Sequence, residues 1–160
     1  MSNGRIRIAG VGNALAGDDA IGIRAIEEIR KADWKHVETV ALPTPGPELF
    51  DGLNGDDLLI LIDACQSGAL AGSVRAFKAD EISTASLRHC STHGIGLSDW
   101  IALTAAAGEI MPEIRIFAVE IEQCGMGKPL SAALIEALPE LLWQVRGCIE
   151  TCCCAEASHA

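Results

Sequence analysis

Asp19, Asp63 and His93 carry the side chains of this sequence that are best suited to hold a metal ion. Asp19 lies in the glycine-rich stretch GVGNALAGDDAIG (residues 10–22), Asp63 closes the apolar run LLILID, and His93 lies in CSTHGIGL. Two carboxylates and one imidazole suit a borderline divalent ion such as Zn²⁺ or Ni²⁺, with positions left for water or substrate. Simpler alternatives stay open, because Asp63 could cap the next loop and His93 could be an ordinary loop histidine.

The glycine-rich stretch is also similar to a phosphate-binding turn. Gly10 and Gly12 match the dinucleotide pattern G-x-G-x-x-G, but Leu15 stands where the third glycine belongs. Asp18 and Asp19 would occupy the anion-attracting start of the next helix and would repel a pyrophosphate. This charge disfavours a nucleotide-binding oxidoreductase. Asp18 could be a plain helix cap, and it is also a candidate acid or base beside the metal site.

Apolar runs alternate with amphipathic stretches along the chain. Strands are predicted at residues 5–9, 37–42, 58–62, 72–77 and 113–120, and helices at 19–31, 96–108 and 131–147. Pro139 is expected to kink the last helix or to start a second one. The alternation predicts an α/β three-layer sandwich, with a twisted, mostly parallel five-stranded sheet and helices on both faces. Such folds bind ligands beyond the carboxyl ends of the strands, where the candidate residues would stand.

Charge and hydropathy exclude several classes of partner. Twelve basic residues stand against 22 acidic ones, for a formal net charge of −10, which disfavours nucleic acid and anionic membranes. No apolar run is long enough to cross a membrane. The opening MSNGRIRIAG lacks the pattern of a secretory signal. We therefore expect a cytoplasmic protein.

The C-terminal residues differ in composition from the rest. We expect a single domain over residues 1–147, followed by a Cys-rich, flexible tail over 148–160. The tail holds Cys148, Cys152, Cys153 and Cys154. These thiols could bind a soft metal, with His159 as a further ligand. Their vicinal arrangement does not match the separated pairs of a zinc site, so a flexible tail of reduced cysteines is the favoured interpretation.

Four motifs in order resemble the maturation endopeptidases of [NiFe] hydrogenases. They are GVGNALAGDDAIG, PTPGPELF (residues 43–50), LLILIDA followed by GALAGSV, and STHGIGL. The resemblance covers about residues 5–146. Members of this family remove a short C-terminal extension from the precursor of the hydrogenase large subunit after nickel has been inserted. The resemblance implies that activity here, with that precursor as partner and a monomeric enzyme.

The resemblance also implies roles for individual residues. Asp19, Asp63 and His93 match the family's metal-contacting positions, and the nickel they recognise would arrive with the substrate; zinc or another divalent ion is an alternative. The same residues are the catalytic candidates, either through the metal or through a carboxylate acting as general base. Asp19 stands where relatives often carry Glu, and Ala41 where many carry Asp. The alternative function is a non-catalytic metal-binding chaperone that uses the same acidic pocket and the Cys-rich tail.

Overall fold

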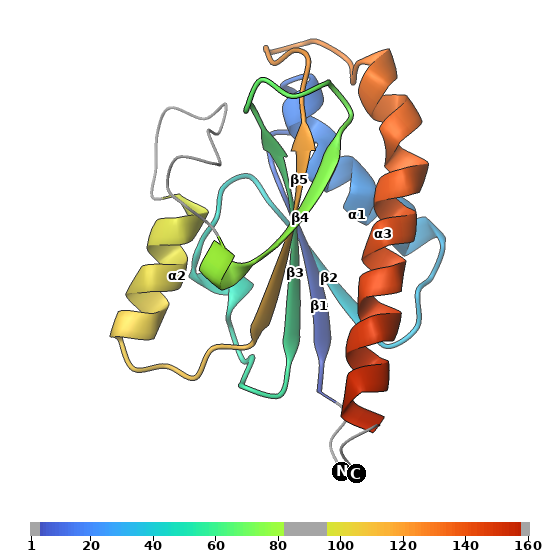
Figure 1. The fold of residues 1–160 in the computed structure, drawn as a ribbon. Coiled ribbons are helices and arrows are strands. Elements are labelled where there is room, and N and C mark those ends of the chain that lie inside the picture. The colour runs from blue at the N-terminus through green and yellow to red at the C-terminus, as the bar shows by residue number, and fades with distance from the viewer. Residues whose placement is uncertain (1–3, 82–95, 158–160) are drawn as a thin grey trace.

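The computed structural model describes residues 4–81 and 96–157, with side chains of the last helix described as far as Cys152 (Figure 1). The strands are β1 (Ile6–Val11), β2 (Val37–Leu42), β3 (Leu58–Cys65), β4 (Val74–Lys78) and β5 (Glu113–Glu120). The helices are α1 (Ile21–Lys31), α2 (Leu97–Ala106) and α3 (Ala132–Ala157), with 3₁₀ turns η1 (Asp18–Ala20), η2 (Pro47–Leu49) and η3 (Ala79–Glu81).

The five strands form one sheet in the order β2-β1-β3-β5-β4. Pairing is parallel throughout except at β4, which runs antiparallel to β5 at the edge. Helices α1 and α3 cover one face of the sheet and α2 covers the other (Figure 1). The three-layer α/β fold expected from the sequence is confirmed.

Two apolar clusters lie on the two faces of the sheet, and β3 contributes to both. Ile60 and Ile62 pack under α1 and α3, whereas Leu59 and Leu61 face the side of α2, as the alternation of side chains along a strand requires. All eight residues of β3 are buried. Burying each of these large aliphatic side chains contributes about 1.5–3 kcal/mol, so β3 makes a large contribution to the stability of both clusters.

Helix α3 differs from the expectation in two ways. It runs through Pro139 as one helix, because Leu134 before the proline and Leu141 after it are both fully buried in the same cluster. It also continues to Ala157, where a flexible tail was expected from residue 148. The apolar spacing continues past Val145 to Cys148 and Cys152, which pack against the same cluster and so extend the helix. No helix in the described part of the chain is long and apolar enough to span a membrane.

Candidate functional site

Two glycines allow α1 to start directly on the carboxyl ends of β1 and β3. A Cβ added at Gly10 would lie 2.1 Å from the carbonyl oxygen of Gly22. A Cβ added at Gly22 would lie 2.5 Å from the carbonyl oxygens of both Val11 and Ile62. The glycines of the first loop therefore permit a close approach of backbone to backbone, in place of cradling a phosphate. The result is that η1, which carries both aspartates of the loop, contacts β3.

Asp18 is fully buried and accepts hydrogen bonds from another part of the chain. Its carboxylate receives the backbone N–H groups of Glu122 (3.0 Å), Gln123 (3.0 Å) and Ser131 (2.6 Å), and the Ser131 hydroxyl (2.9 Å). Burial alone would raise the pKa of Asp18, but the hydrogen bonds outweigh it and hold that pKa below its usual value. These contacts indicate that Asp18 anchors η1 to the loop after β5, and the role of acid or base that was one alternative for Asp18 stays a prediction.

Asp19 is half-buried, and its carboxylate is oriented by its own loop. The backbone N–H of Asn13 donates to Asp19 Oδ2 at 2.8 Å, and the Asn13 side chain in turn accepts the N–H of Leu15 at 2.9 Å. The loop that follows β1 thus folds back, so that Asn13 holds the carboxylate of Asp19. Asp19 keeps access to solvent while its orientation is fixed, which is what a residue that meets a substrate requires.

We expected Asp63 to end its strand. Instead, Asp63 lies inside β3. The strand continues for two more residues because β3 stays in register with β5, pairing Asp63 with Ala118 and Cys65 with Glu120. The Asp63 side chain is 5% exposed, and the N–H of Ala64 donates to its Oδ1 at 2.8 Å. Because η1 packs against β3, Asp19 in η1 and Asp63 near the end of β3 lie at the same, carboxyl end of the sheet.

His93 lies outside the described residues, so the meeting of all three predicted ligands stays a prediction. Within residues 4–81 and 96–157, no group of three or more His, Cys, Asp and Glu side chains is arranged to hold a metal ion. The described part of the chain therefore supplies the two carboxylates of the predicted set and leaves the imidazole to be tested.

Glu120 is a residue of this region that the sequence analysis missed. It ends β5 and is 3% exposed, and it accepts the Ser67 N–H (2.9 Å), the Ser67 hydroxyl (2.7 Å), the Gly68 N–H (3.0 Å) and the Cys65 thiol (3.4 Å). Burial alone would raise the pKa of Glu120, yet these hydrogen bonds hold it below its usual value. Burial raises the pKa of the Cys65 thiol to about 11. The signal was available, because Glu120 directly follows the apolar run IFAV, as Asp63 follows LLILI.

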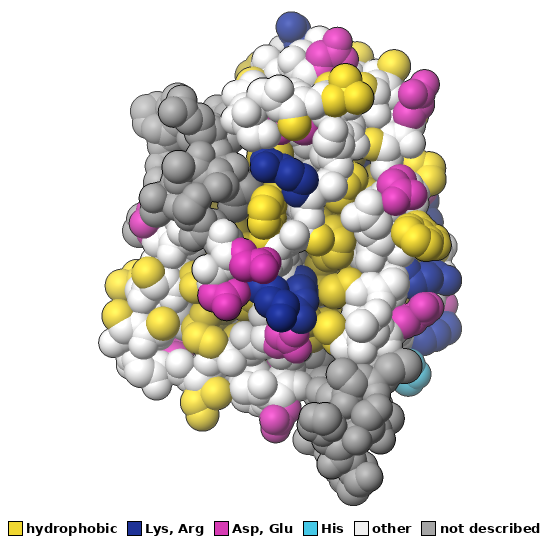
Figure 2. Space-filling model, viewed as in Figure 1, with side chains coloured by type: hydrophobic (Ala, Val, Ile, Leu, Met, Phe, Trp, Pro, Cys, Tyr) yellow, Lys and Arg dark blue, Asp and Glu magenta, His cyan; other side chains and the backbone are white. Residues whose placement is uncertain are grey.

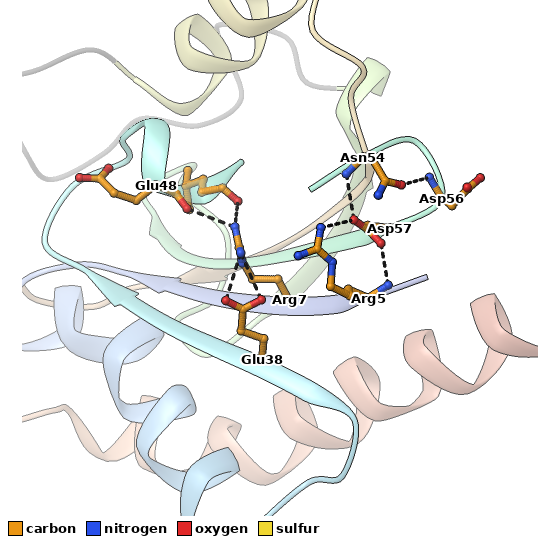
Figure 3. Close-up of polar contacts among 8 residues, drawn as sticks. Arg5, Arg7, Glu38, Glu48, Asn54, Asp56 and Asp57 are labelled. Atoms are coloured by element: carbon orange, nitrogen blue, oxygen red, sulfur yellow. Dashed lines mark hydrogen bonds and ion pairs between the residues drawn. The ribbon is translucent and has the colours of Figure 1, made fainter. Parts of the chain in front are cut away.

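The amino end of the sheet carries a different kind of polar cluster (Figure 3). Asp57 accepts the backbone N–H of Arg5 at 2.7 Å and its guanidinium at 3.1 Å. Arg7, only 5% exposed, donates to both carboxylate oxygens of Glu38 (3.0 and 3.1 Å) and to the carbonyl oxygen of Leu49 (3.1 Å). Arginine therefore neutralises the carboxylates at this end.

Several known proteins are similar to this chain in sequence. A family model described as hydrogenase maturation protease matches residues 23–146. Hydrogenase 2 maturation protease of Escherichia coli strain K12 is 30% identical over 149 residues, which cover 89% of this chain and 91% of that protein. Hydrogenase expression/formation protein HoxM of Azotobacter vinelandii is 29% identical over 147 residues, covering 86% and 70% respectively.

Solved structures agree with these matches. The hydrogenase maturating endopeptidase HybD from E. coli superposes with a TM-score of 0.77 at 26% identity, covering 92% of this chain and 93% of that one. The [NiFe] hydrogenase maturation protease HybD from Thermococcus kodakarensis superposes with a TM-score of 0.67 at 22% identity, covering 89% and 97%. The second likeness bears on the fold alone.

Proposed function

Since the chain belongs to the hydrogenase maturation protease family, we propose that it is the endopeptidase that removes the C-terminal extension of a [NiFe]-hydrogenase large-subunit precursor after nickel insertion. The observation that carries this proposal is the position of Asp19 in η1 and of Asp63 near the end of β3, both at the carboxyl end of the sheet. Ligands of open α/β sheets bind at that end.

We assign recognition of nickel on the precursor to Asp19, Asp63 and His93. Carboxylate and imidazole groups are suitable ligands for a borderline divalent ion. Of the two carboxylates, Asp19 in η1 is half-exposed and Asp63 in β3 is buried. A metal ion that reaches the site with the precursor would polarise the scissile carbonyl or acidify a water. Cleavage would then report that nickel loading is complete.

The chain's own residues would then orient the reaction. Asp19 is held by the Asn13 N–H, so one carboxylate oxygen is engaged while the residue still faces solvent. In a carboxylate-catalysed route, Asp19 or Asp63 would take the proton from the attacking water. Asp18 and Glu120 would act as positioning residues, since each ties down a loop beside these carboxylates.

We place this reaction in a reducing compartment such as the cytoplasm. The four described cysteines whose side chains are placed, Cys65, Cys124, Cys148 and Cys152, are free thiols. Free thiols are typical of reducing compartments, whereas exported proteins more often pair them.

A processing assay tests the proposal. The purified protein is mixed with an unprocessed large-subunit precursor, with and without nickel, and the product is weighed by mass spectrometry. Asp19→Asn is compared with Asp33→Asn, which removes the same charge from an exposed residue of the turn before β2. The expected result is loss of a C-terminal peptide from the nickel-loaded precursor alone, with wild type and Asp33→Asn but not with Asp19→Asn. Metal retention without any cleavage would instead support a metal-binding chaperone.

A further inference from the structure

Two cysteines of α3 lie one helical turn apart, far from the predicted nickel-recognition residues in the sequence. Cys148 and Cys152 are both free thiols, and both are only partly buried against the cluster beneath α1 and α3. Residues four apart on a helix share one face, so the two side chains point the same way. The hydrogenase-processing site makes no use of this pair.

The two cysteines line the same groove beside α3. Burial raises the pKa of Cys148, and the neighbouring Cys152 raises this pKa further. The Arg115 guanidinium on β5 acts in the opposite direction and favours the thiolate, while Glu113 opposes it. Arg115 and Glu113 also form an ion pair with each other. Cys148 therefore stays protonated and unreactive near neutral pH unless something displaces its proton.

The thiols are open to solvent through a groove between α3 and the β4–β5 edge. This groove has a volume of about 390 Å³, and its lining includes Phe117, Trp143, Cys148 and Cys152, with Arg115 beside them. Figure 2 shows this face of the molecule, with apolar side chains between the sheet edge and α3 and basic side chains next to them. An ion can thus reach sulfur atoms that lie in largely apolar surroundings.

Helix geometry disfavours a disulfide between these two residues. Side chains four apart on a helix have Cβ atoms about 5–6 Å apart, whereas a disulfide needs about 3.5–4.5 Å. A disulfide would therefore have to distort α3, whose preceding turn packs on the core through Leu141 and Val145. An ion held between the two sulfur atoms bridges the longer span without moving the backbone.

The donor set also selects the kind of ion. Thiolates are soft ligands that favour Cu(I) and zinc. Zinc in a structural site requires a tetrahedral ligand set, and the described residues supply no group of three or more His, Cys, Asp and Glu side chains there. Monovalent Cu(I) can be bound by two sulfur ligands alone, in a linear two-coordinate geometry.

We propose that Cys148 and Cys152 form a two-thiolate site for a soft monovalent cation of the Cu(I) type. Binding releases the two thiol protons to solvent, forms two sulfur–metal bonds and changes no oxidation state. Two thiolates and one monovalent cation leave a single negative charge, which Arg115 lies close enough to stabilise. Because protons are released on binding, retention of the ion strengthens as the pH rises.

The test is an anaerobic titration of the reduced full-length protein with Cu(I) alone, against a chromophoric Cu(I) chelator as competitor. Wild type and the control Cys124→Ser, which changes an exposed cysteine, should retain one equivalent. The double variant Cys153→Ser/Cys154→Ser should also retain it. Cys148→Ser/Cys152→Ser and each of its single variants should lose it, with helix content unchanged by circular dichroism.

Two results would overturn the proposal. One is undiminished retention in Cys148→Ser/Cys152→Ser, and the other is loss of retention in Cys153→Ser/Cys154→Ser, which would move the site to the following cysteines. If the serine variants fold poorly, Cys148→Ala and Cys152→Ala repeat the comparison with a residue that fits an apolar surface. Since the readout is bound Cu(I), the result does not depend on whether the chain cleaves a hydrogenase precursor.

Discussion

The two ends of the sheet stabilise their carboxylates in opposite ways. At the amino end, Asp57 is paired with Arg5, and Glu38 with Arg7 (Figure 3). At the carboxyl end, Asp18 and Glu120 are satisfied by backbone N–H groups, serine hydroxyls and a thiol. These donors are electrically neutral.

The difference bears on what each end can do. In an arginine–carboxylate pair the two charges cancel, so the pair contributes to stability and leaves no net charge. Neutral donors stabilise a carboxylate and leave its negative charge in place, so the carboxyl end keeps a field that attracts a cation. Asp19 and Asp63 stand in that field, which suits recognition of a metal carried by another protein.

Removing Asp18 should have the largest effect on stability. Asp18→Ala leaves three backbone N–H groups and the Ser131 hydroxyl without their acceptor, which should lower the free energy of unfolding by about 3 kcal/mol or more. Urea unfolding measures the change. Asp33→Asn, in an exposed turn, should change stability by less than about 0.5 kcal/mol. Equal stabilities for Asp18→Ala and wild type would remove Asp18 as an anchor.

Removing Asp19 should instead affect activity far more than stability. Its carboxylate receives one hydrogen bond from Asn13 and is half-exposed, so Asp19→Asn should cost about 1 kcal/mol or less. Processing of the nickel-loaded precursor should fall by about 100-fold or more, the range typical of losing a catalytic acid or base. Product formation by mass spectrometry and urea unfolding on the same sample separate the two effects.

Acid should weaken the carboxyl end through Asp18 and Glu120. Both have pKa values lowered by folding, so the unfolded chain binds more protons and stability falls as pH drops below about 4 toward the folded pKa values. Asp18→Asn should flatten this part of the curve of unfolding free energy against pH. An unchanged slope in Asp18→Asn would contradict the lowered pKa.

Substitution of Glu120 tests whether the loop after β3 is needed for processing of the precursor. Glu120→Gln keeps the shape of the side chain but removes the charge that holds Ser67 and Gly68, and should cost about 1–2 kcal/mol. We expect about a tenfold fall in kcat/KM, since a small displacement of positioning loops weakens catalysis. Full activity at a lowered Tm would show that Glu120 serves the fold alone.

The amino end should give the smallest effects and the clearest dependence on salt. Glu38 is 48% exposed in its ion pair with Arg7, so Glu38→Gln should cost less than about 1 kcal/mol. The difference from wild type should shrink at about 1 M salt, where charges are screened. The cost of Asp18→Ala should not shrink, because its partners are neutral. Processing activity should be unchanged by Glu38→Gln.

Much of this architecture could be predicted because apolar runs and charged faces are local signals. The runs around Leu59–Ile62 and Ile114–Val119 indicated strands, and the spacing of Ile21, Ala25 and Ile29 indicated a helix. What could not be predicted depends on partners distant in sequence. The sequence suggested a helix cap or an acid or base for Asp18, whereas the hydrogen bond from Ser131, 113 residues away, could not be predicted from local patterns.

The end of α3 illustrates the same limit. The crowded cysteines from residue 148 onward suggested a flexible tail after the last helix. Cys148 and Cys152 nevertheless continue the buried stripe of the helix, and burial on the core outweighs local propensity. His93 lies outside the described residues, so its role as third ligand rests on its sequence motif.

The most direct measurement is the affinity of the chain for its precursor with and without nickel. Wild type, Asp19→Asn and Glu38→Gln are each titrated with both forms of the large-subunit precursor, which compares the two ends of the sheet in one experiment. The account predicts that wild type and Glu38→Gln prefer the nickel-loaded precursor and that Asp19→Asn loses the preference. Equal affinity of wild type for both forms, or a preference that survives in Asp19→Asn, would contradict nickel recognition by the carboxyl end.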